Sequence, residues 1–419
     1  MSSPSPQVLA MALLLLLLAA TSYVTALNLH GVGTPEGLGS GLNTRSMTSW
    51  DINLWPRKDR VPTVHYKFGD ETVDHDAVLA GMATIEKDTC IRFKKVQSFL
   101  YFGSHLIIRN SERTCSLHVG RKWMNLFGQN LYLTKICAAN PGTVLRQLVR
   151  AIGKNPEENR YDRTDHIHVM YRNIQTGHYI NFIRWFYRTF GVPYDFYSIL
   201  QSGPLASSRN GKTTLYAKDL QMQSLMAVER TQLSFMDRLL INTAYKCTED
   251  WLEDCNEGSN PCQNMGYLNA TCSCDCPDGT LGDTCQNKTM SYNDALLATL
   301  SPLTETLDVN ATVSTTDYPT PQDAEVVFTK TFTSAGHTEI NITFEGFNLS
   351  PRCADDSCCE EGLEVHLSNQ RPPQGTWYCG NEIPTGTTLS ANGTLILFYM
   401  KADSPGNTYK GFNANVTFV

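Results

Sequence analysis

The sequence predicts a multidomain protein: a first domain with both helices and strands, a small disulfide-rich module and an all-β sandwich. With 419 residues, the chain is longer than a single hydrophobic core usually spans. Six of the 14 cysteines fall between 255 and 285, a density typical of a small domain stapled by disulfides. Helix and strand patterns alternate before this cluster, whereas strand patterns alone recur from 324 onward.

Composition excludes few functions. Hydrophobic residues make up 41% and charged residues 18% of the chain, as in ordinary globular proteins. A net charge of −7 without a long basic run gives no reason to expect nucleic acid as a partner.

Residues 1–26 are predicted to be a secretory signal peptide. An apolar run of 13 residues from Val8 to Ala20 includes six consecutive leucines and leads to a small-residue cleavage signal at 24–26. The alternative is an uncleaved membrane anchor, but the run is shorter than the roughly 20 residues that span a bilayer. The mature protein is therefore expected to be secreted, with no transmembrane segment after cleavage.

Cysteines and glycosylation sequons support the same extracellular location. An even number of cysteines in a chain with a signal peptide predicts disulfides rather than free thiols. Seven Asn-x-Ser/Thr sequons predict N-glycosylation, and all lie beyond residue 260. They are Asn269, Asn287, Asn310, Asn341, Asn348, Asn392 and Asn415.

The first domain is expected to follow a flexible segment. Residues 27–50 are rich in Gly, Ser and Thr and predict a flexible stretch, with order beginning near Trp55. Asp74 opens a predicted helix, and Thr143 caps a second one that stops at Gly153. Apolar residues predict strands over 61–68, 106–109 and 130–133.

The C-terminal part is predicted to be all-β. Residues 286–320 are rich in Thr, Ser and Asn and contain two sequons, so they are predicted to be a linker. Beyond them, strand patterns are separated by turns rich in Gly, Pro, Asn and Ser, which favours a β-sandwich. The predicted strands are 326–332, 339–344, 362–367, 395–400 and 413–418.

The second predicted helix carries two arginines, Arg146 and Arg150, one turn apart. With the residues that follow it, segment 143–163 resembles the zinc-binding segment of the astacin family, H-E-x-x-H-x-x-G-x-x-H-E-x-x-R-x-D-R. In that family the histidines bind zinc, and the first glutamate takes a proton from zinc-bound water. The framework residues of the pattern match in register: Gly153, Glu157, Arg160, Asp162 and Arg163.

The chemical positions of this pattern are replaced. Arg146, Arg150 and Pro156 stand at the three histidine positions, and Gln147 stands at the catalytic glutamate. A guanidinium stays protonated and has no lone pair for a cation, and proline has no side-chain donor. Gln147 is not a base at neutral pH. The resemblance therefore implies a domain whose relatives bind zinc, but which here has no metal ligand, no catalytic residue and no cofactor.

A second segment departs from the family in the same way. Residues 197–203 resemble the family's Met-turn, S-x-M-H-Y-G, and keep its serine and glycine at Ser198 and Gly203. The family's Tyr can ligate zinc and assist the transition state, and Ser202, at its position, is too short for either role. Leu200 and Gln201 replace the Met and the His.

The resemblance to the astacin family covers residues 51–250. It implies a two-lobed, metzincin-like α+β peptidase domain, which is predicted to be inactive. It also implies two disulfides, Cys90–Cys247 and Cys115–Cys137. The first would close a loop of more than 150 residues.

Two further resemblances cover the rest of the chain. In 251–285, the spacing Cys274-x-Cys276-x8-Cys285 is similar to that of an EGF-like module. In 321–419, the run Trp377-Tyr378-Cys379-Gly380 follows the pattern of a CUB domain. Together they imply the disulfides Cys255–Cys272, Cys262–Cys274 and Cys276–Cys285, with Cys358–Cys379 as the best choice beside the adjacent Cys359.

These features predict a secreted, catalytically inactive astacin-like metalloprotease homologue that is not an enzyme and binds extracellular proteins or peptides. Arg146 and Arg150 could hold an acidic peptide in the cleft or pair internally with Glu157 or Asp162. Internal pairing is favoured, because buried arginines need partners. Two alternatives are a residual zinc-dependent endopeptidase of extracellular proteins and a structural component of a matrix or cuticle.

Overall fold

The structure, a computed structural model, describes residues 53–70, 73–96, 101–122, 125–333, 339–354, 356–368 and 375–419. All described residues lie in the unit that spans 43–419. The predicted signal peptide and the flexible segment 27–50 therefore lie outside the described residues. Among the described residues, no helix is both long and apolar enough to cross a membrane.

The first domain is built on a six-stranded mixed sheet. Its strands run in the order β1-β2-β4-β6-β5, and β3 also pairs with β2. The pairs β2–β3, β2–β4 and β4–β6 are parallel. The strands are β1 (Arg57–Lys58), β2 (Val61–Phe68), β3 (Arg92–Lys95), β4 (Leu106–Asn110), β5 (Ser116–Leu117) and β6 (Gln129–Leu133).

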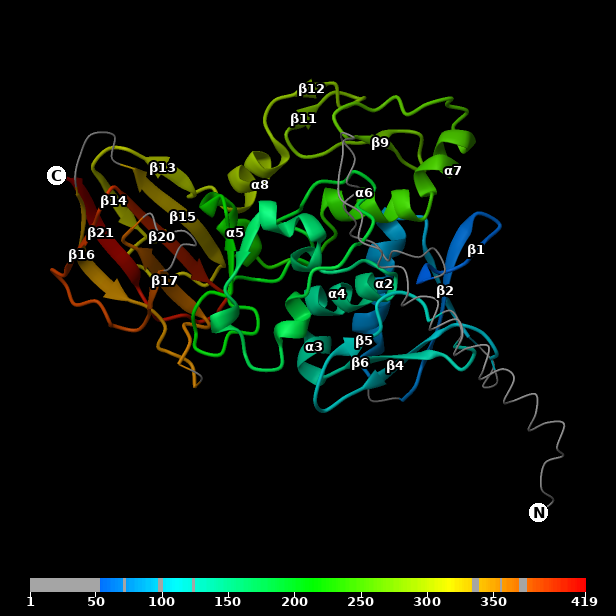
Figure 1. The fold of residues 1–419 in the computed structure, drawn as a ribbon, viewed down its shortest axis with the longest axis horizontal. Helices are drawn as coiled ribbons and strands as arrows, with labels where there is room; N and C mark the ends of the chain where they lie inside the picture. Colours follow the sequence, from blue (N-terminus) through cyan, green and yellow to red (C-terminus); the bar gives the residue numbers. More distant parts are fainter. Residues whose placement is uncertain are drawn as a thin grey trace, which may run out of the picture. The chain divides into compact units, whose positions relative to one another are not determined.

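Two helices of this domain, α2 (His75–Asp88) and α4 (Pro141–Ala151), pack against each other and share the main hydrophobic core with the sheet (Figure 1). The α2 start is as predicted, since the Asp74 side chain accepts a hydrogen bond from the Ala77 backbone N–H at 3.0 Å. The predicted start of α4 at Thr143 is wrong. Asn140 is the cap and accepts from the Thr143 N–H, because Asn is an equally good cap and Pro141 suits the first helical position.

Beyond α4 the chain forms short elements around a second cluster of buried apolar side chains, which includes Ile174, Leu215 and Leu225. Regular helices resume at α6 (Phe235–Ala244), which opens with a capping box between Ser234 and Asp237. The remaining elements are α3 (Lys135–Ala139), η2 (Glu157–Asn159), η3 (Tyr161–Asp165), β7 (Ile167–Val169), η4 (Tyr171–Asn173), η5 (Tyr179–Phe182), β8 (Leu215–Ala217), η6 (Leu220–Met222), α5 (Gln223–Ala227) and α7 (Cys247–Asp254).

The disulfide-rich segment has two short hairpins and almost no apolar core beyond its cysteines. Its strands are β9 (Tyr267–Leu268), β10 (Cys274–Asp275), β11 (Thr280–Leu281) and β12 (Asn287–Lys288). Every described cysteine is paired. The pairs are Cys90–Cys247, Cys115–Cys137, Cys255–Cys272, Cys262–Cys274, Cys276–Cys285, Cys358–Cys379 and Cys353–Cys359, and the sequence implied all but the last.

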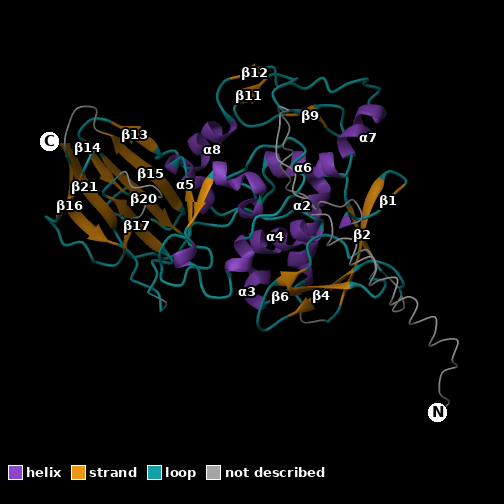
Figure 2. Ribbon diagram, viewed as in Figure 1, coloured by secondary structure: helices purple, strands orange, loops and turns teal. Residues whose placement is uncertain are grey.

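The described residues from 301 onward form strands and no helix (Figure 2). They make a five-stranded sheet, β13-β15-β20-β17-β18, and a four-stranded sheet, β14-β21-β16-β19, which share one apolar core. The strands are β13 (Glu305–Leu307), β14 (Ala311–Ser314), β15 (Val326–Thr333), β16 (Ile340–Asn348), β17 (Glu361–His366), β18 (Thr376–Tyr378), β19 (Thr388–Ala391), β20 (Thr394–Lys401) and β21 (Gly411–Phe418).

The predicted linker over 286–320 is corrected by this arrangement. It contains a helix, α8 (Tyr292–Leu300), and both β13 and β14 belong to the C-terminal sheets. β13 pairs in parallel with β15, and β14 pairs with β21. The polar composition of the segment is consistent with strands at the edges of their sheets, where one side of each strand faces away from the sheet.

Candidate functional site

The helix α4 presents two different faces. Val144, Leu148 and Val149 are fully buried in the main core, as the 3.6-residue period requires. Gly153, with φ of +102°, ends the helix region and turns the chain, a conformation that glycine adopts without strain. The face away from the core carries the side chains at the replaced positions, Arg146, Gln147 and Arg150.

Arg146 joins α4 to the second replaced segment. Its Nη1 donates to the carbonyls of Ile199 and Gln201 at 3.1 and 3.0 Å. Its Nη2 donates to the carbonyl of Leu200 at 3.1 Å and to the Ser202 hydroxyl at 2.8 Å. The structure therefore brings the two replaced segments together, and an arginine provides the connection between them.

Glu158 completes this contact, and nothing in the sequence beyond its charge predicted this role. Its carboxylate accepts from the backbone N–H of Ser202 at 3.2 Å and from the Ser202 hydroxyl. The Oε1 atom of Glu158 lies 3.9 Å from Nη2 of Arg146. Burial lowers the pKa of Arg146, and the negative charge of Glu158 opposes that shift. Arg146 thus pairs internally, but with Glu158 rather than with Glu157 or Asp162.

Arg150 has far fewer partners. Its Nη1 donates to the Gln147 side-chain oxygen at 3.3 Å, and its buried Nε has no acceptor among the described residues. Burial lowers the pKa of Arg150, and the like charge of Arg146 lowers it further. The predicted pairing with Glu157 or Asp162 does not form, because other cations bind those carboxylates.

Those cations are Lys154 and Arg160, which belong to a buried network of charged side chains. Lys154, 1% exposed, donates from Nζ to Glu157 at 2.6 Å and lies 3.1 Å from Asp237. Burial would lower the pKa of Lys154, but the charges of Glu157 and Asp237 outweigh it and raise that pKa. Arg160 binds Glu157 at 3.2 Å and Asp162 at 2.7 Å. Three framework residues of the motif therefore form part of the interior.

The second replaced segment is also fixed by this interior. The Ser198 hydroxyl donates to Asp237 at 2.7 Å and accepts from Lys154 at 2.9 Å. Leu200 is fully buried, and the buried Gln201 accepts from the hydroxyl of Tyr194 at 2.6 Å. Sequence reasoning missed Lys154 and Asp237, because a charged residue with no motif gives no sign of the partner it meets in the fold.

The side chains at these positions do not fit a zinc ion. The Arg146 guanidinium donates hydrogen bonds to carbonyl and hydroxyl oxygens. Neither Arg146 nor Arg150 has a lone pair to donate to a metal ion. Pro156 heads η2 and has no side-chain donor. Within the described part of the chain, no group of three His, Cys, Asp or Glu side chains is placed to hold a metal ion.

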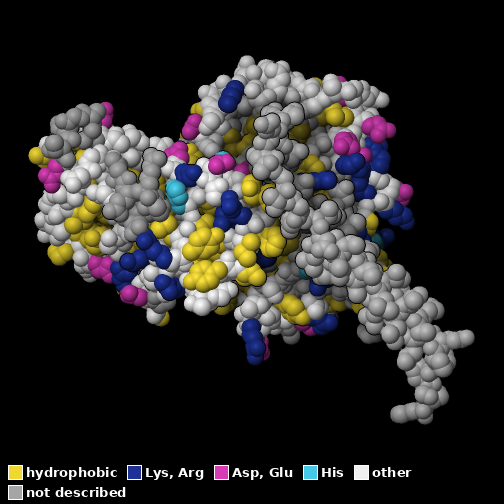
Figure 3. All heavy atoms as spheres, viewed as in Figure 1, with side chains coloured by type: hydrophobic (Ala, Val, Ile, Leu, Met, Phe, Trp, Pro, Cys, Tyr) yellow, Lys and Arg dark blue, Asp and Glu magenta, His cyan; other side chains and the backbone are white. Residues whose placement is uncertain are grey.

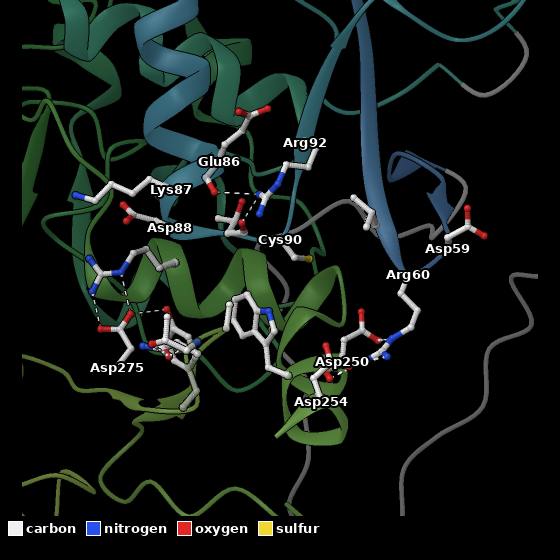
Figure 4. A pocket seen from close by; sticks show the side chains of 18 residues that line it. Asp59, Arg60, Glu86, Lys87, Asp88, Cys90, Arg92, Asp250, Asp254 and Asp275 are labelled. Atoms are coloured by element: carbon white, nitrogen blue, oxygen red, sulfur yellow. Dashed lines mark hydrogen bonds and ion pairs between the residues drawn. The ribbon is translucent and has the colours of Figure 1, made fainter. Parts of the chain in front are cut away.

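A cavity of about 650 Å³ lies elsewhere, where the end of α2 and the helix α7 approach the disulfide-rich segment (Figure 4). Several of the charged side chains in its walls form ion pairs. Arg60 contacts Asp250 and Asp254 at 3.1 and 2.9 Å, and Arg238 contacts Asp275 at 3.1 Å. In each of these ion pairs the two side chains neutralise each other. A charged ligand would therefore be attracted less strongly to the cavity than to the surface of α4.

Comparisons with known proteins match two parts of the chain. Residues 48–246 match the astacin family (peptidase family M12A), and residues 304–416 match the CUB domain. Blastula protease 10 of Paracentrotus lividus is 28% identical over 393 residues, 91% of this chain and 61% of that protein. Zinc metalloproteinase nas-34 of Caenorhabditis elegans is 28% identical over 378 residues, 87% of this chain and 56% of that protein.

A solved structure also aligns with part of the chain. High choriolytic enzyme 1, a hatching enzyme zinc-protease from Oryzias latipes, aligns over 48% of this chain and 100% of its own, with 23% identity and a TM-score of 0.42. The chain spans about 60% of the length of the first curated relatives it matches.

These matches correct one prediction. The replaced side chains predicted that the chain is not an enzyme, whereas the peptidase-family match and relatives named as proteases point to a peptidase. The prediction rested on a few side chains such as Arg146 and Gln147, while framework residues along the whole domain define the family. At 28% identity, activity itself does not carry over from a relative.

Proposed function

We propose that the chain, which contains an astacin (peptidase M12A) domain and a CUB domain, binds a polypeptide partner outside the cell through the peptidase-family domain. The observation that carries this proposal is an exposed group of large apolar side chains, called here the aromatic patch. Its members are 40–67% exposed: Tyr171, Tyr179, Ile180, Ile183, Trp185 and Phe186.

The members of the aromatic patch fall in one short stretch of the chain, 171–186, and ring contacts join some of them to neighbours. The rings of Tyr171 and Tyr179 lie 6.4 Å apart. Phe186 stacks on Tyr161 at 4.1 Å, and Arg184 lies over the same Tyr161 ring. Contiguous apolar surface of this kind marks interaction sites, whereas single exposed apolar residues are ordinary.

Charge favours an acidic partner. The stretch 166–193 contains no Asp or Glu and carries Arg172, Arg184 and Arg188. On the face drawn in Figure 3, hydrophobic side chains gather near the middle beside Lys and Arg side chains. A polypeptide with apolar and acidic residues fits such a surface, since complementary charge guides association.

An extracellular location rests on the sequence. The signal-peptide pattern, the sequons and the paired cysteines all agree with secretion. A CUB domain supports a binding role as well, because such domains often mediate protein interactions.

The test compares three full-length secreted proteins: the wild type, the patch variant W185S/F186S and the control F102S/F127S. Phe102 and Phe127 are 70% and 76% exposed and also contact each other, so the control removes a matched aromatic pair. Each protein is used to capture partners from extracellular fluid of the source tissue, with quantitative mass spectrometry. Partners retained by the wild type and the control but lost by the patch variant support the proposal. Equal retention by all three rejects it.

A second candidate, a zinc-dependent endopeptidase, is favoured by the family match over 48–246. The measurement is casein turnover by the pure protein, before and after a chelator, with zinc content determined in parallel. Turnover that stops with the chelator and returns with zinc supports this candidate. Binding is needed for either function, so capture and turnover are measured on the same preparation.

A further inference from the structure

We infer that Arg150 forms an anion-binding site for a carboxylate group of the polypeptide partner, presented next to an apolar residue. This inference rests on the proposed function and names the chemistry that the domain recognises.

The first argument is that Arg150 is under-satisfied. A guanidinium carries five N–H donors, and the structure gives this one a single hydrogen bond, to Gln147 at 3.3 Å. Its Nε is buried without an acceptor, and no ion pair with a described carboxylate forms. A cation removed from water without a counter-charge is costly, so an incoming carboxylate would be bound favourably.

The second argument is that the other cations at the site are already satisfied. Arg146 has four acceptors and the nearby carboxylate of Glu158. Arg160 binds both Glu157 and Asp162. Arg230, whose Nε also lacks an acceptor among the described residues, still donates to three carbonyls. Arg150 therefore has the fewest partners of these cations, and its fork suits bidentate carboxylate binding.

The third argument concerns access and surroundings. The Arg150 side chain is half-buried, so a ligand can reach it from the surface. Arg146 adds positive charge beside it, and Glu158, the nearest acid, is already bound to Ser202. The site thus attracts anions without a free internal competitor among the described residues.

The fourth argument places an apolar contact next to the anion. The Tyr187 hydroxyl group and the Arg150 charge interact, so Tyr187 lies on the same side of the domain as Arg150. Trp185 is two residues away along the chain, so its backbone lies within about 7 Å of that of Tyr187. Trp185 belongs to the aromatic patch and is 51% exposed. An acidic residue followed by an apolar one would therefore contact both.

The test uses two peptides that differ only in charge, Ac-Leu-Glu-Leu-NH2 and Ac-Leu-Gln-Leu-NH2, titrated into the full-length protein at fixed ionic strength. The wild type is expected to bind the Glu peptide about tenfold more tightly, and R150Q is expected to lose this preference. R113Q is the matched control, since Arg113 is exposed, lies outside the stretch 166–193 and forms no side-chain hydrogen bond or ion pair with the described residues. A wild type without preference, or a preference that survives in R150Q, overturns the inference.

Folding provides a second readout. Because R150M removes a half-buried cation that has no ion pair with a described residue, its Tm is expected to rise by about 2–4 °C. A clear fall in Tm would show that Arg150 is a structural cation with internal partners and would overturn the site. The two proposals fail separately. If W185S/F186S keeps every partner while the Glu preference still requires Arg150, the proposed function fails and the anion site stands.

Discussion

Arg146 shows how one side chain can take over a structural task at a position where relatives hold a metal ligand. It links α4 to the carbonyls of Ile199, Leu200 and Gln201, of which Gln201 also accepts a hydrogen bond from Arg230. Hydrogen bonds from a charged donor are stronger than those between neutral groups, and a buried acceptor without a donor is costly. Arg146 therefore stabilises the site in a way that Arg150, one turn along, does not.

The substitution R146A is expected to lower the free energy of unfolding by about 3 kcal/mol, because it leaves several carbonyls and Glu158 without their cation. Urea denaturation followed by circular dichroism measures the change. R172A is the control and is expected to shift stability by less than about 0.5 kcal/mol, as exposed substitutions usually do. A similar loss in both variants would contradict the role assigned to Arg146.

Asp195 gives the buried network a pH dependence. It is 2% exposed and accepts from the Ser234 hydroxyl and the Tyr197 N–H at 2.6 and 2.9 Å, both neutral donors. Burial, together with the charges of Asp237 and Glu157, raises the pKa of Asp195 to about 7. The folded protein therefore holds a proton there that the unfolded chain, with an ordinary pKa of about 3.9, releases earlier.

The sign of the effect follows from proton binding. Between about pH 4 and pH 7 the folded state binds more protons at Asp195 than the unfolded state, so this carboxyl makes stability fall as pH rises. Because D195N has no carboxyl at this position, its free energy of unfolding should rise relative to that of the wild type between about pH 4 and pH 7. Above this window the difference should stay constant. Urea unfolding at half-unit pH steps measures the difference. A difference that does not change with pH would contradict the raised pKa.

Among the segments of the chain, those with local signals were predicted well. β2 covers the predicted residues 61–68, and α2 begins after Asp74. The short elements after α4 were not predicted, because a helix of three to five residues has no periodic pattern to detect. β13 and β14 were missed for a different reason: their pairing partners lie far along the chain.

The disulfides should differ in their contribution according to the loop that each closes. Cys90–Cys247 spans 157 residues and Cys276–Cys285 spans 9. On the chain-entropy model, losing the first should cost about 5 kcal/mol and losing the second about 2.5 kcal/mol. C90A/C247A is therefore expected to unfold at a clearly lower urea concentration than C276A/C285A. The reverse order would show that native-state contacts, rather than loop closure, dominate.

Glycosylation of the chain would support its expected extracellular location. All seven sequons lie beyond 260, and Asn287, Asn310 and Asn392 are exposed in the structure. A glycan on an exposed asparagine displaces no packed side chain, so these three sites are expected to be modified in the secreted protein. Peptide mass spectrometry after enzymatic deglycosylation in heavy-oxygen water marks each modified site. Unmodified Asn287, Asn310 and Asn392 would argue against passage through the secretory pathway.

The motifs in the sequence were enough to show the resemblance to the astacin and CUB domains, and this resemblance implied six disulfide pairs that the structure contains. The motifs could do this because caps, cysteine spacing and a turn glycine act over a few residues. Which acid meets which cation depended on the folded chain. Arg146 reaches carbonyls more than 50 residues away, and Lys154 meets Asp237, so these contacts arise from packing between distant segments. The isolation of Arg150 has the same origin, because a charge is unpaired only in relation to neighbours that the fold brings together.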